Sequence, residues 1–186
     1  PRVVETMTDI YTTWMDFGID GFRIDTAKHV DFAFWQTFTS ALVDHQAATP
    51  AGDQFFTFGE VYDADATLLS PYVRDTDMDS VLDFAYQSAS TNWARGYTAQ
   101  GMAALFDADD HYITPTSSAA DLPTFVGNHD MGRIGYLLRD SGRLDERAAF
   151  AHTTMLLTRG QPVIYYGDEQ GFVGLRTEGF EADDAV

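Results

Sequence analysis

Short apolar stretches alternate with longer segments of helical periodicity along nearly the whole chain. Because each apolar stretch is followed by a crossover segment, this order predicts an α/β fold with a parallel sheet. Strands are expected at 19–25, 55–61, 80–84, 122–126 and 161–167. Helices are expected at 1–17, from 31 to 42 or slightly beyond, and at 64–72, 87–107 and 144–158, with a turn at 49–53.

Charged or polar side chains stand at the ends of three expected strands: Arg23 and Asp25, Glu60, and His129 with Asp130. Catalytic groups at the C-terminal ends of several parallel strands are typical of the (β/α)₈ barrel. A doubly wound sheet also binds ligands there, but it usually carries a glycine-rich phosphate turn, which this sequence lacks. The predicted fold is therefore α/β, a partial (β/α)₈ TIM barrel of about five strand–helix units that forms one domain over 1–186.

Five strands cannot close such a barrel. A complete barrel takes about 250 residues, whereas this chain has 186. The strands at 19–25 and 161–167 would each leave an open edge, which favours aggregation. We therefore expect the chain on its own to be neither stable nor active, and we expect its function to belong to an intact parent protein.

The composition excludes several classes of partner. The net charge of −18 argues against nucleic acids and anionic membrane surfaces, because both attract basic proteins, whereas a neutral sugar is not repelled. No stretch approaches the roughly 20 apolar residues of a membrane span. The absence of cysteine excludes disulfides and thiol chemistry. An acidic chain without cysteine suits secretion or a salty environment, which slightly favours a secreted protein.

The segment G-I-D-G-F-R-I-D-T-A-K-H-V at 18–30 places charges inside an apolar strand. Side chains alternate between the two faces of a strand, so Arg23 and Asp25 are expected on one face and Phe22 and Ile24 on the other. An arginine beside Asp25 would favour the ionised carboxylate that a nucleophile needs. A purely structural Arg–Asp pair at the end of a strand is the alternative.

Three motifs carry a family resemblance. G-F-R-I-D-T-A-K-H at 21–29, F-G-E-V at 58–61 and F-V-G-N-H-D at 125–130 resemble, in order and spacing, the later three of four signature regions of the α-amylase family of glycoside hydrolases (family 13). Q-P-V-I-Y-Y-G-D-E-Q-G-F at 161–172 resembles the family's eighth barrel strand and the loop after it. The first signature region, the first two strands and the inserted domain have no match in this sequence.

The resemblance implies a role for each matching residue. Asp25 corresponds to the catalytic nucleophile, Glu60 to the general acid/base, and Asp130 to the third carboxylate that stabilises the transition state. Arg23 corresponds to the arginine that holds the nucleophile, and His129 to a histidine that contacts sugar hydroxyls near the cleaved bond. A plain structural role for His129 is the alternative.

Two further residues of the first motif have implied contacts. Lys28 and His29 correspond to a pair that contacts the sugar on the leaving-group side in α-amylase-like members. A solvated lysine at the start of a helix is the alternative for Lys28. The backbone carbonyl that corresponds to His29 also ligates calcium in some α-amylases. The chemistry requires no cofactor, so the resemblance allows a structural calcium without requiring one.

The chemistry of a retaining glycosidase agrees with these roles. It needs two carboxyl groups about 5–5.5 Å apart, of which one attacks the anomeric carbon and the other protonates the leaving oxygen. We expect the pKa of Glu60 to be raised by burial and by neighbouring carboxylates, Asp130 among them. His129 and Asp130 are adjacent, so both can reach the site only if the strand has already turned into a loop there.

Other acidic groups give weaker signals. The spacing of Asp75, Asp77 and Asp79 begins like an EF-hand loop, but Ser80 and Tyr86 stand where glycine and glutamate are required. A solvated acidic loop is therefore expected there.

The loop after the last strand leaves two alternatives. Asp168 and Glu169 could line the cleft or form a structural turn, and the sequence leaves both open.

The predicted function is retaining hydrolysis of α-glucosidic bonds, above all the α-1,4 links of starch or maltooligosaccharides. Related transglycosylase, pullulanase-like or α-glucosidase activity is the first alternative, and the pair Lys28–His29 favours an amylase. A barrel that binds sugar or protein without catalysis is the second alternative. The presence of Arg23 and all three carboxylates argues against it.

Overall fold

Residues 2–48 and 55–174 are described by a computed structural model, so the turn expected at 49–53 lies outside the described residues. The chain divides into two units by its internal contacts. The first unit comprises Pro1–Leu82 with His111–Ser117, and the second comprises Asp83–Asp110 with Ser118–Val186.

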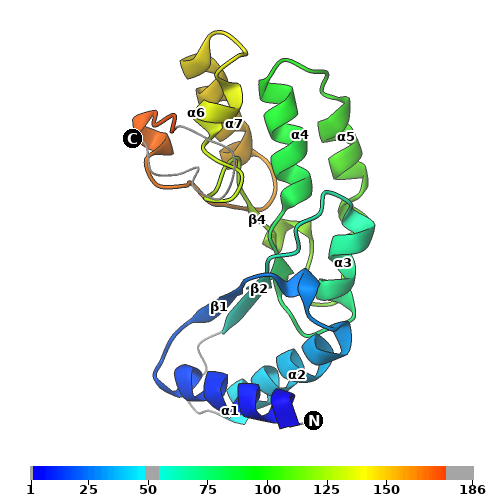
Figure 1. Ribbon diagram of the computed structural model, residues 1–186. Helices are drawn as coiled ribbons and strands as arrows, with labels where there is room; N and C mark the ends of the chain where they lie inside the picture. Colours follow the sequence, from blue (N-terminus) through cyan, green and yellow to red (C-terminus); the bar gives the residue numbers. More distant parts are fainter. Residues whose placement is uncertain (1, 49–54, 175–186) are drawn as a thin grey trace. The chain divides into compact units, whose positions relative to one another are not determined.

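Three parallel strands form the sheet of the first unit, in the order β1 (Gly21–Ile24), β2 (Phe56–Gly59) and β3 (Ser80–Val81). The helices are α1 (Arg2–Asp16), α2 (Phe32–Ala48) and α3 (Ala66–Arg74), and the short 3₁₀ turn η1 (Ala27–His29) follows β1. Helix α1 packs against α2, and α3 contacts β3 (Figure 1). The register pairs Arg23 with Phe58 and Ile24 with Gly59, so the residues that follow β1 and β2 emerge side by side.

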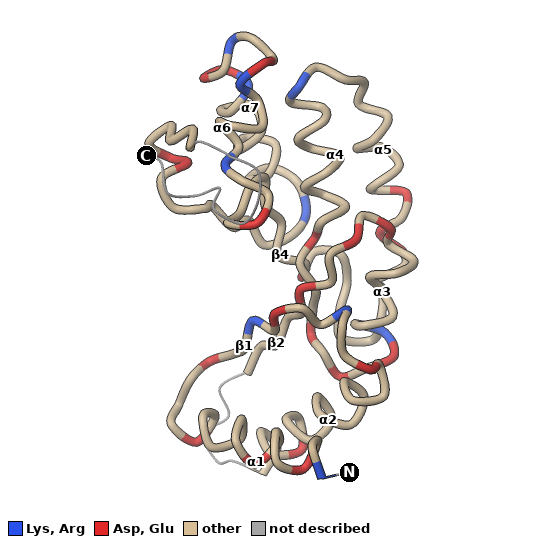
Figure 2. The backbone as a smooth tube through the Cα atoms, in the orientation of Figure 1, with Lys and Arg blue, Asp and Glu red and all other residues tan. Residues whose placement is uncertain are grey.

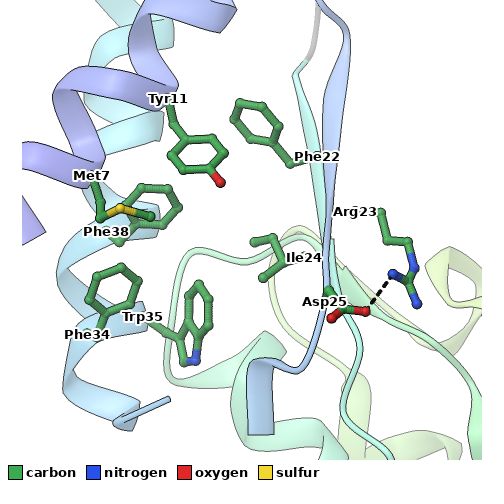
Figure 3. Close-up of a pocket in the computed structure, with 9 residues that line it drawn as sticks. All are labelled: Met7, Tyr11, Phe22, Arg23, Ile24, Asp25, Phe34, Trp35 and Phe38. Carbon is green, nitrogen blue, oxygen red and sulfur yellow. Dashed lines mark hydrogen bonds and ion pairs between the residues drawn. The ribbon is translucent and has the colours of Figure 1, made fainter. Parts of the chain in front are cut away.

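Aromatic side chains line a pocket of about 310 Å³ between β1 and the two helices α1 and α2. The ring of Phe22 lies 5.0 Å from Tyr11 and 4.9 Å from Phe55, and Tyr11 lies 5.7 Å from Phe38. Figure 3 shows Phe22 and Ile24 directed toward these helices, with Arg23 on the other side of the strand. The predicted alternation along this strand is confirmed.

The second unit contains the parallel pair β4 (Pro123–Thr124) and β5 (Gln161–Pro162) and the helices α4 (Phe84–Ala94), α5 (Gln100–Asp107), α6 (Ile134–Leu138) and α7 (Leu144–Leu157). Helix α4 packs against α5 and α7, and α6 packs against α7 (Figure 1). Apolar side chains of these helices and of the segment after β4 form its core: Tyr86, Ala94, Met102, Leu105, Val126, Ile134, Leu138, Ala151 and Met155.

The α/β class and the parallel pairing agree with the sequence prediction, but the strands are shorter than expected. The strand predicted at 80–84 ends at Val81, because the Asp83 side chain accepts the Tyr86 main-chain N–H at 2.8 Å and starts α4 at Phe84. The helix predicted at 87–107 is two helices, separated near Gly96, whose φ is +100°. Within the described residues the strands pair as two sheets of three and two strands, and they close no barrel.

Acidic residues are distributed over both units, as Figure 2 shows for loops and helices alike. The few basic residues are spread as well, and the ion pairs described below involve several of them. In the part of the chain that the structure describes, every helix is too short or too polar to cross a membrane.

Candidate active site

Arg23 contacts two carboxyl groups where β1 and β2 end. Its Nη1 lies 2.9 Å from Oδ1 of Asp25, and its Nη2 lies 3.4 Å from Oε2 of Glu60 (the pair with Asp25 is drawn in Figure 3). The parallel register brings these residues together, because the Glu60 main-chain N–H donates to the Ile24 carbonyl at 2.7 Å. The structure thus joins three of the predicted site residues in one cluster.

The two carboxyl groups have different environments. The Asp25 side chain is 63% exposed, whereas Glu60 is buried, with 7% of the residue exposed. Burial raises the pKa of Glu60, and the hydrogen bond and charge of Asp25 raise it further. The Thr26 main-chain N–H, 3.2 Å from Oε2, and the charge of Arg23 lower it, and the net pKa is above its ordinary value. The raised pKa expected for Glu60 from burial and from a neighbouring carboxylate agrees with these contacts, whereas the contribution expected from Asp130 stays a prediction.

Gly59 allows the loops after β1 and β2 to pack closely beside Glu60. A Cβ atom at this position would lie 2.7 Å from the Met78 sulfur and 3.3 Å from the Ala27 Cβ. Ala27 is fully buried, its N–H donates to the Glu60 carbonyl at 3.0 Å, and the Trp35 indole N–H donates to the Ala27 carbonyl at 2.9 Å. The main chain around Glu60 is therefore fixed by close packing and by hydrogen bonds.

Lys28 connects the turn after β1 to the loop after β2. Its Nζ lies 2.8 Å from Oδ2 of Asp63 and donates to the Tyr62 carbonyl at 3.1 Å. The hydrogen bond from Lys28 is the main cause that lowers the pKa of Asp63. Lys28 is thus an anchored residue with a partly exposed side chain. His29 is exposed, and its main-chain N–H donates to the Thr26 carbonyl at 2.9 Å.

His129 and Asp130 lie in a turn of the second unit, after β4 has ended. The Asn128 side-chain oxygen accepts the main-chain N–H groups of Asp130 at 3.1 Å and of Met131 at 2.8 Å. Nε2 of His129 lies 3.2 Å from Oδ2 of Asp130. The expectation that the strand has turned into a loop here is confirmed. The convergence of His129 and Asp130 with the cluster of the first unit stays a prediction.

Asn128 shapes this turn, a role that the sequence motifs did not predict. Asparagine side chains commonly accept a main-chain N–H two residues further on, so an Asn between a glycine and a His–Asp pair was an available signal.

The acidic residues of the last loop form a structural turn. The Asp168 side chain is fully buried, and its Oδ1 lies 3.4 Å from Nη1 of Arg133. Burial is the main cause that raises the pKa of Asp168. Oε2 of Glu169 accepts the Gly167 main-chain N–H at 2.8 Å. Of the two alternatives left open, the structural turn is the one that the contacts support.

The loop with Asp75, Asp77 and Asp79 has a structural use at one position. Asp79 is only partly exposed, and its Oδ2 accepts the main-chain N–H of Thr57 at 2.7 Å and the Thr57 hydroxyl at 3.0 Å. The solvated loop expected from the sequence is therefore wrong for Asp79, whereas Asp75 and Asp77 are exposed.

Across 2–48 and 55–174, no three histidine or acidic side chains gather in a way that could hold a metal ion. The backbone carbonyl of His29 is the one ligand that the resemblance offers, and His29 is exposed. A calcium ion bound by this carbonyl stays a prediction.

Comparisons with known proteins place this chain among α-amylases and their relatives. An α-amylase of Streptomyces lividans is 48% identical over 182 residues, which cover 94% of this chain and 20% of that protein. A cyclomaltodextrin glucanotransferase of Niallia circulans is 34% identical over 172 residues, which cover 89% of this chain and 22% of that protein. The crystal structure of a Geobacillus thermoleovorans α-amylase complexed with acarbose matches with a TM-score of 0.81 at 25% identity.

The chain matches only part of each relative. It spans about a fifth of the length of the two proteins compared by sequence. The match to the solved structure covers 98% of this chain and 41% of that structure. The family model of the alpha-amylase catalytic domain matches residues 1–186, the whole of the sequence. The chain therefore belongs to the α-amylase catalytic-domain family.

Proposed function

We propose that the intact protein hydrolyses α-1,4 glucosidic bonds of starch or maltooligosaccharides with retention of configuration. The observation that carries the proposal is the pair of carboxyl groups on Arg23, of which one is exposed and the other is buried with a raised pKa. Two neighbouring carboxyl groups in such different environments are suited to act as nucleophile and acid.

In the first step, Asp25 attacks the anomeric carbon while Glu60 gives its proton to the leaving glycosidic oxygen. Arg23 holds the Asp25 carboxylate in place through the 2.9 Å ion pair. The bond from the anomeric carbon to the leaving oxygen breaks as the bond to the Asp25 carboxylate forms. In the second step, Glu60 takes a proton from water, and the hydroxide displaces the carboxylate, which restores both residues.

Asp130 and His129 would complete this site in the parent protein. The turn held by Asn128 presents both side chains from a loop, which a continuous strand could not do. Asp130 would stabilise the positive charge of the transition state, and His129 would contact sugar hydroxyls. Lys28 and His29 would contact the sugar on the leaving-group side, and the anchoring of Lys28 by Asp63 supports a fixed position there.

In the parent, the chain would supply about five of the eight strand–helix units of one catalytic barrel. The parallel strands with helical crossovers support this arrangement, as does the match to part of a solved α-amylase. Both units would then belong to a single domain. A structural calcium at the His29 carbonyl is compatible with this proposal only if the rest of the parent provides the other ligands.

Transglycosylation is a second candidate, because one relative is a cyclomaltodextrin glucanotransferase. The same two carboxyl groups serve both reactions, which differ in whether water or a sugar hydroxyl accepts the glycosyl group. The higher identity to an α-amylase, 48% against 34%, favours hydrolysis. Pullulanase-like or α-glucosidase action and sugar binding without catalysis have no comparable support.

The test uses the parent protein with maltoheptaose and follows the anomeric protons of the first products by NMR. We expect fresh α-anomer from the wild type and none from Asp25→Asn. Asp44→Asn makes the same chemical change on the exposed surface of α2 and serves as the matched control, which should behave like the wild type. Fresh β-anomer would contradict the retaining mechanism and the roles of Asp25 and Glu60.

A further inference from the structure

Thr26, directly after Asp25, has a main-chain conformation that threonine rarely adopts. Its φ and ψ are 50° and 32°, in the left-handed region. A β-branched side chain is disfavoured there, and such residues cluster at functional sites. Apart from glycines, only Thr26 and Arg143 have positive φ within 2–48 and 55–174. The Thr26 side chain is exposed and caps nothing, so it does not explain the conformation.

The main-chain N–H of Thr26 has the carboxyl group of Glu60 as its partner. It donates to Oε2 of Glu60 at 3.2 Å, and Nη2 of Arg23 lies 3.4 Å from the same oxygen. An oxygen that accepts a hydrogen bond and lies beside a guanidinium group is a poor place for a proton. The protonated form of Glu60 is therefore favoured with its proton on Oε1.

The surrounding contacts hold Thr26 in this conformation from both sides. The Ala27 N–H donates to the Glu60 carbonyl at 3.0 Å, and the His29 N–H donates to the Thr26 carbonyl at 2.9 Å. Ala27 is fully buried beneath the Trp35 indole, which donates to its carbonyl. A strained residue persists where its neighbours determine the conformation in this way.

We propose that Thr26 is a positioning residue, whose main-chain N–H holds Oε2 of Glu60 so that the proton for the leaving group is kept on Oε1. The inference rests on the proposed role of Glu60 as acid/base and adds the group that orients it. The same N–H opposes the effect of burial on the pKa of Glu60. It therefore keeps the acid from becoming too weak to give up its proton.

The test removes this N–H and leaves the side chain in place. In the parent protein, Thr26 is replaced by its α-hydroxy acid analogue, which puts an ester in place of the amide. Loss of a donor to the carboxylate should raise the pKa of Glu60, so the alkaline limb of kcat/KM on maltoheptaose should move up by about one pH unit. We also expect kcat at the optimum to fall several-fold.

Two matched variants separate orientation of Glu60 from support of the loop. The same ester at Ala27 deletes a neighbouring hydrogen bond between these two loops, but its acceptor is the Glu60 carbonyl and not the carboxylate. It should lower stability without moving the alkaline limb. Thr26→Gly keeps the N–H and tolerates positive φ, so its alkaline limb should stay with that of the wild type. An unmoved limb in the Thr26 ester, or an equal movement in the Ala27 ester, would overturn the inference.

A second test uses the wild-type parent protein, so its main measurement does not depend on whether a variant folds. The amide proton shift of Thr26 should titrate with the pKa of Glu60, and this titration should disappear in Glu60→Gln. A flat Thr26 shift in a wild type that cleaves maltoheptaose would contradict this inference alone. A wild type that does not act on α-glucans would contradict the proposed function instead.

Discussion

Each unit contains an arginine that contacts two carboxyl groups, and the two clusters differ in how far those groups face solvent. In the first unit Arg23 contacts Asp25 and Glu60, and the Asp25 side chain is 63% exposed. In the second unit Arg159 contacts Asp83 and Asp109, and the Asp83 side chain is fully buried. An arginine between two acids is therefore not by itself a sign of catalysis.

In the second cluster, the contacts of Asp83 are structural. One oxygen of Asp83 accepts the Tyr86 main-chain N–H at 2.8 Å and so caps α4, while the other contacts Arg159. Both carboxylate oxygens of Asp83 therefore have structural partners. In the first cluster, the exposed Asp25 leaves room for a substrate, and the buried Glu60 has the raised pKa of an acid. The unequal environments within the first cluster are what favour chemistry there.

The largest expected difference is between Asp25→Asn and Asp83→Asn in the parent protein. Asp25→Asn removes the nucleophile, so kcat on maltoheptaose should fall by roughly 10⁴-fold or more, with unfolding changed by less than about 1 kcal/mol. Asp83→Asn should lower the free energy of unfolding by about 3 kcal/mol and leave the folded enzyme active. Steady-state kinetics and urea unfolding measure the two effects. Equal losses of activity in two folded variants would contradict the comparison.

Replacing the arginines should give the same pattern of stability. Arg159→Met leaves the buried Asp83 without its cation, so the free energy of unfolding should fall by about 3–5 kcal/mol. Arg23→Met should cost less than about 1 kcal/mol, because the Arg23 side chain is one-third exposed. The kcat/KM of Arg23→Met should nevertheless fall steeply. If urea unfolding showed Arg23 to be the more important residue for stability, the structural alternative for its ion pair would be favoured.

The smallest expected effect concerns stability as a function of pH. The folded-state pKa of Glu60 is raised above 4.5, so its contribution to stability is fully present below pH 4.5 and is lost as the pH rises through the folded value. Glu60→Gln does not titrate. As the pH rises from 4.5 through the folded-state pKa of Glu60, the free energy of unfolding of this variant should therefore increase relative to that of the wild type. The total increase should be about 1.4 kcal/mol for each pH unit between the unfolded-state and folded-state pKa values of Glu60. Urea unfolding at a series of pH values tests this, and a difference that does not change with pH would contradict the raised pKa.

Much of the first cluster could be predicted from the sequence, because strand alternation and parallel register are local and regular. Arg23 and Phe22 lie on the faces that the pattern indicated, and Glu60 follows its strand as expected. The loop at Asn128 could also be anticipated from the adjacency of His129 and Asp130.

Other features depend on contacts that no local pattern reveals. The run 80–84 looks like a strand, but the cap at Asp83 turns its end into a helix, and short apolar runs do not distinguish the two. The pairing of Asp168 with Arg133 joins residues far apart in sequence. The left-handed conformation of Thr26 is imposed by its neighbours and not by its own preference.

Covalent trapping of the parent protein identifies the nucleophile directly. A fluorinated α-maltosyl fluoride slows the breakdown of a glycosyl–enzyme intermediate, and peptide mass spectrometry then locates the sugar. We expect the sugar to be attached to Asp25 and Asp25→Asn not to be labelled. A sugar on Glu60, or turnover of the reagent without any covalent species in the wild type, would contradict the assignment of the two carboxyl groups held by Arg23.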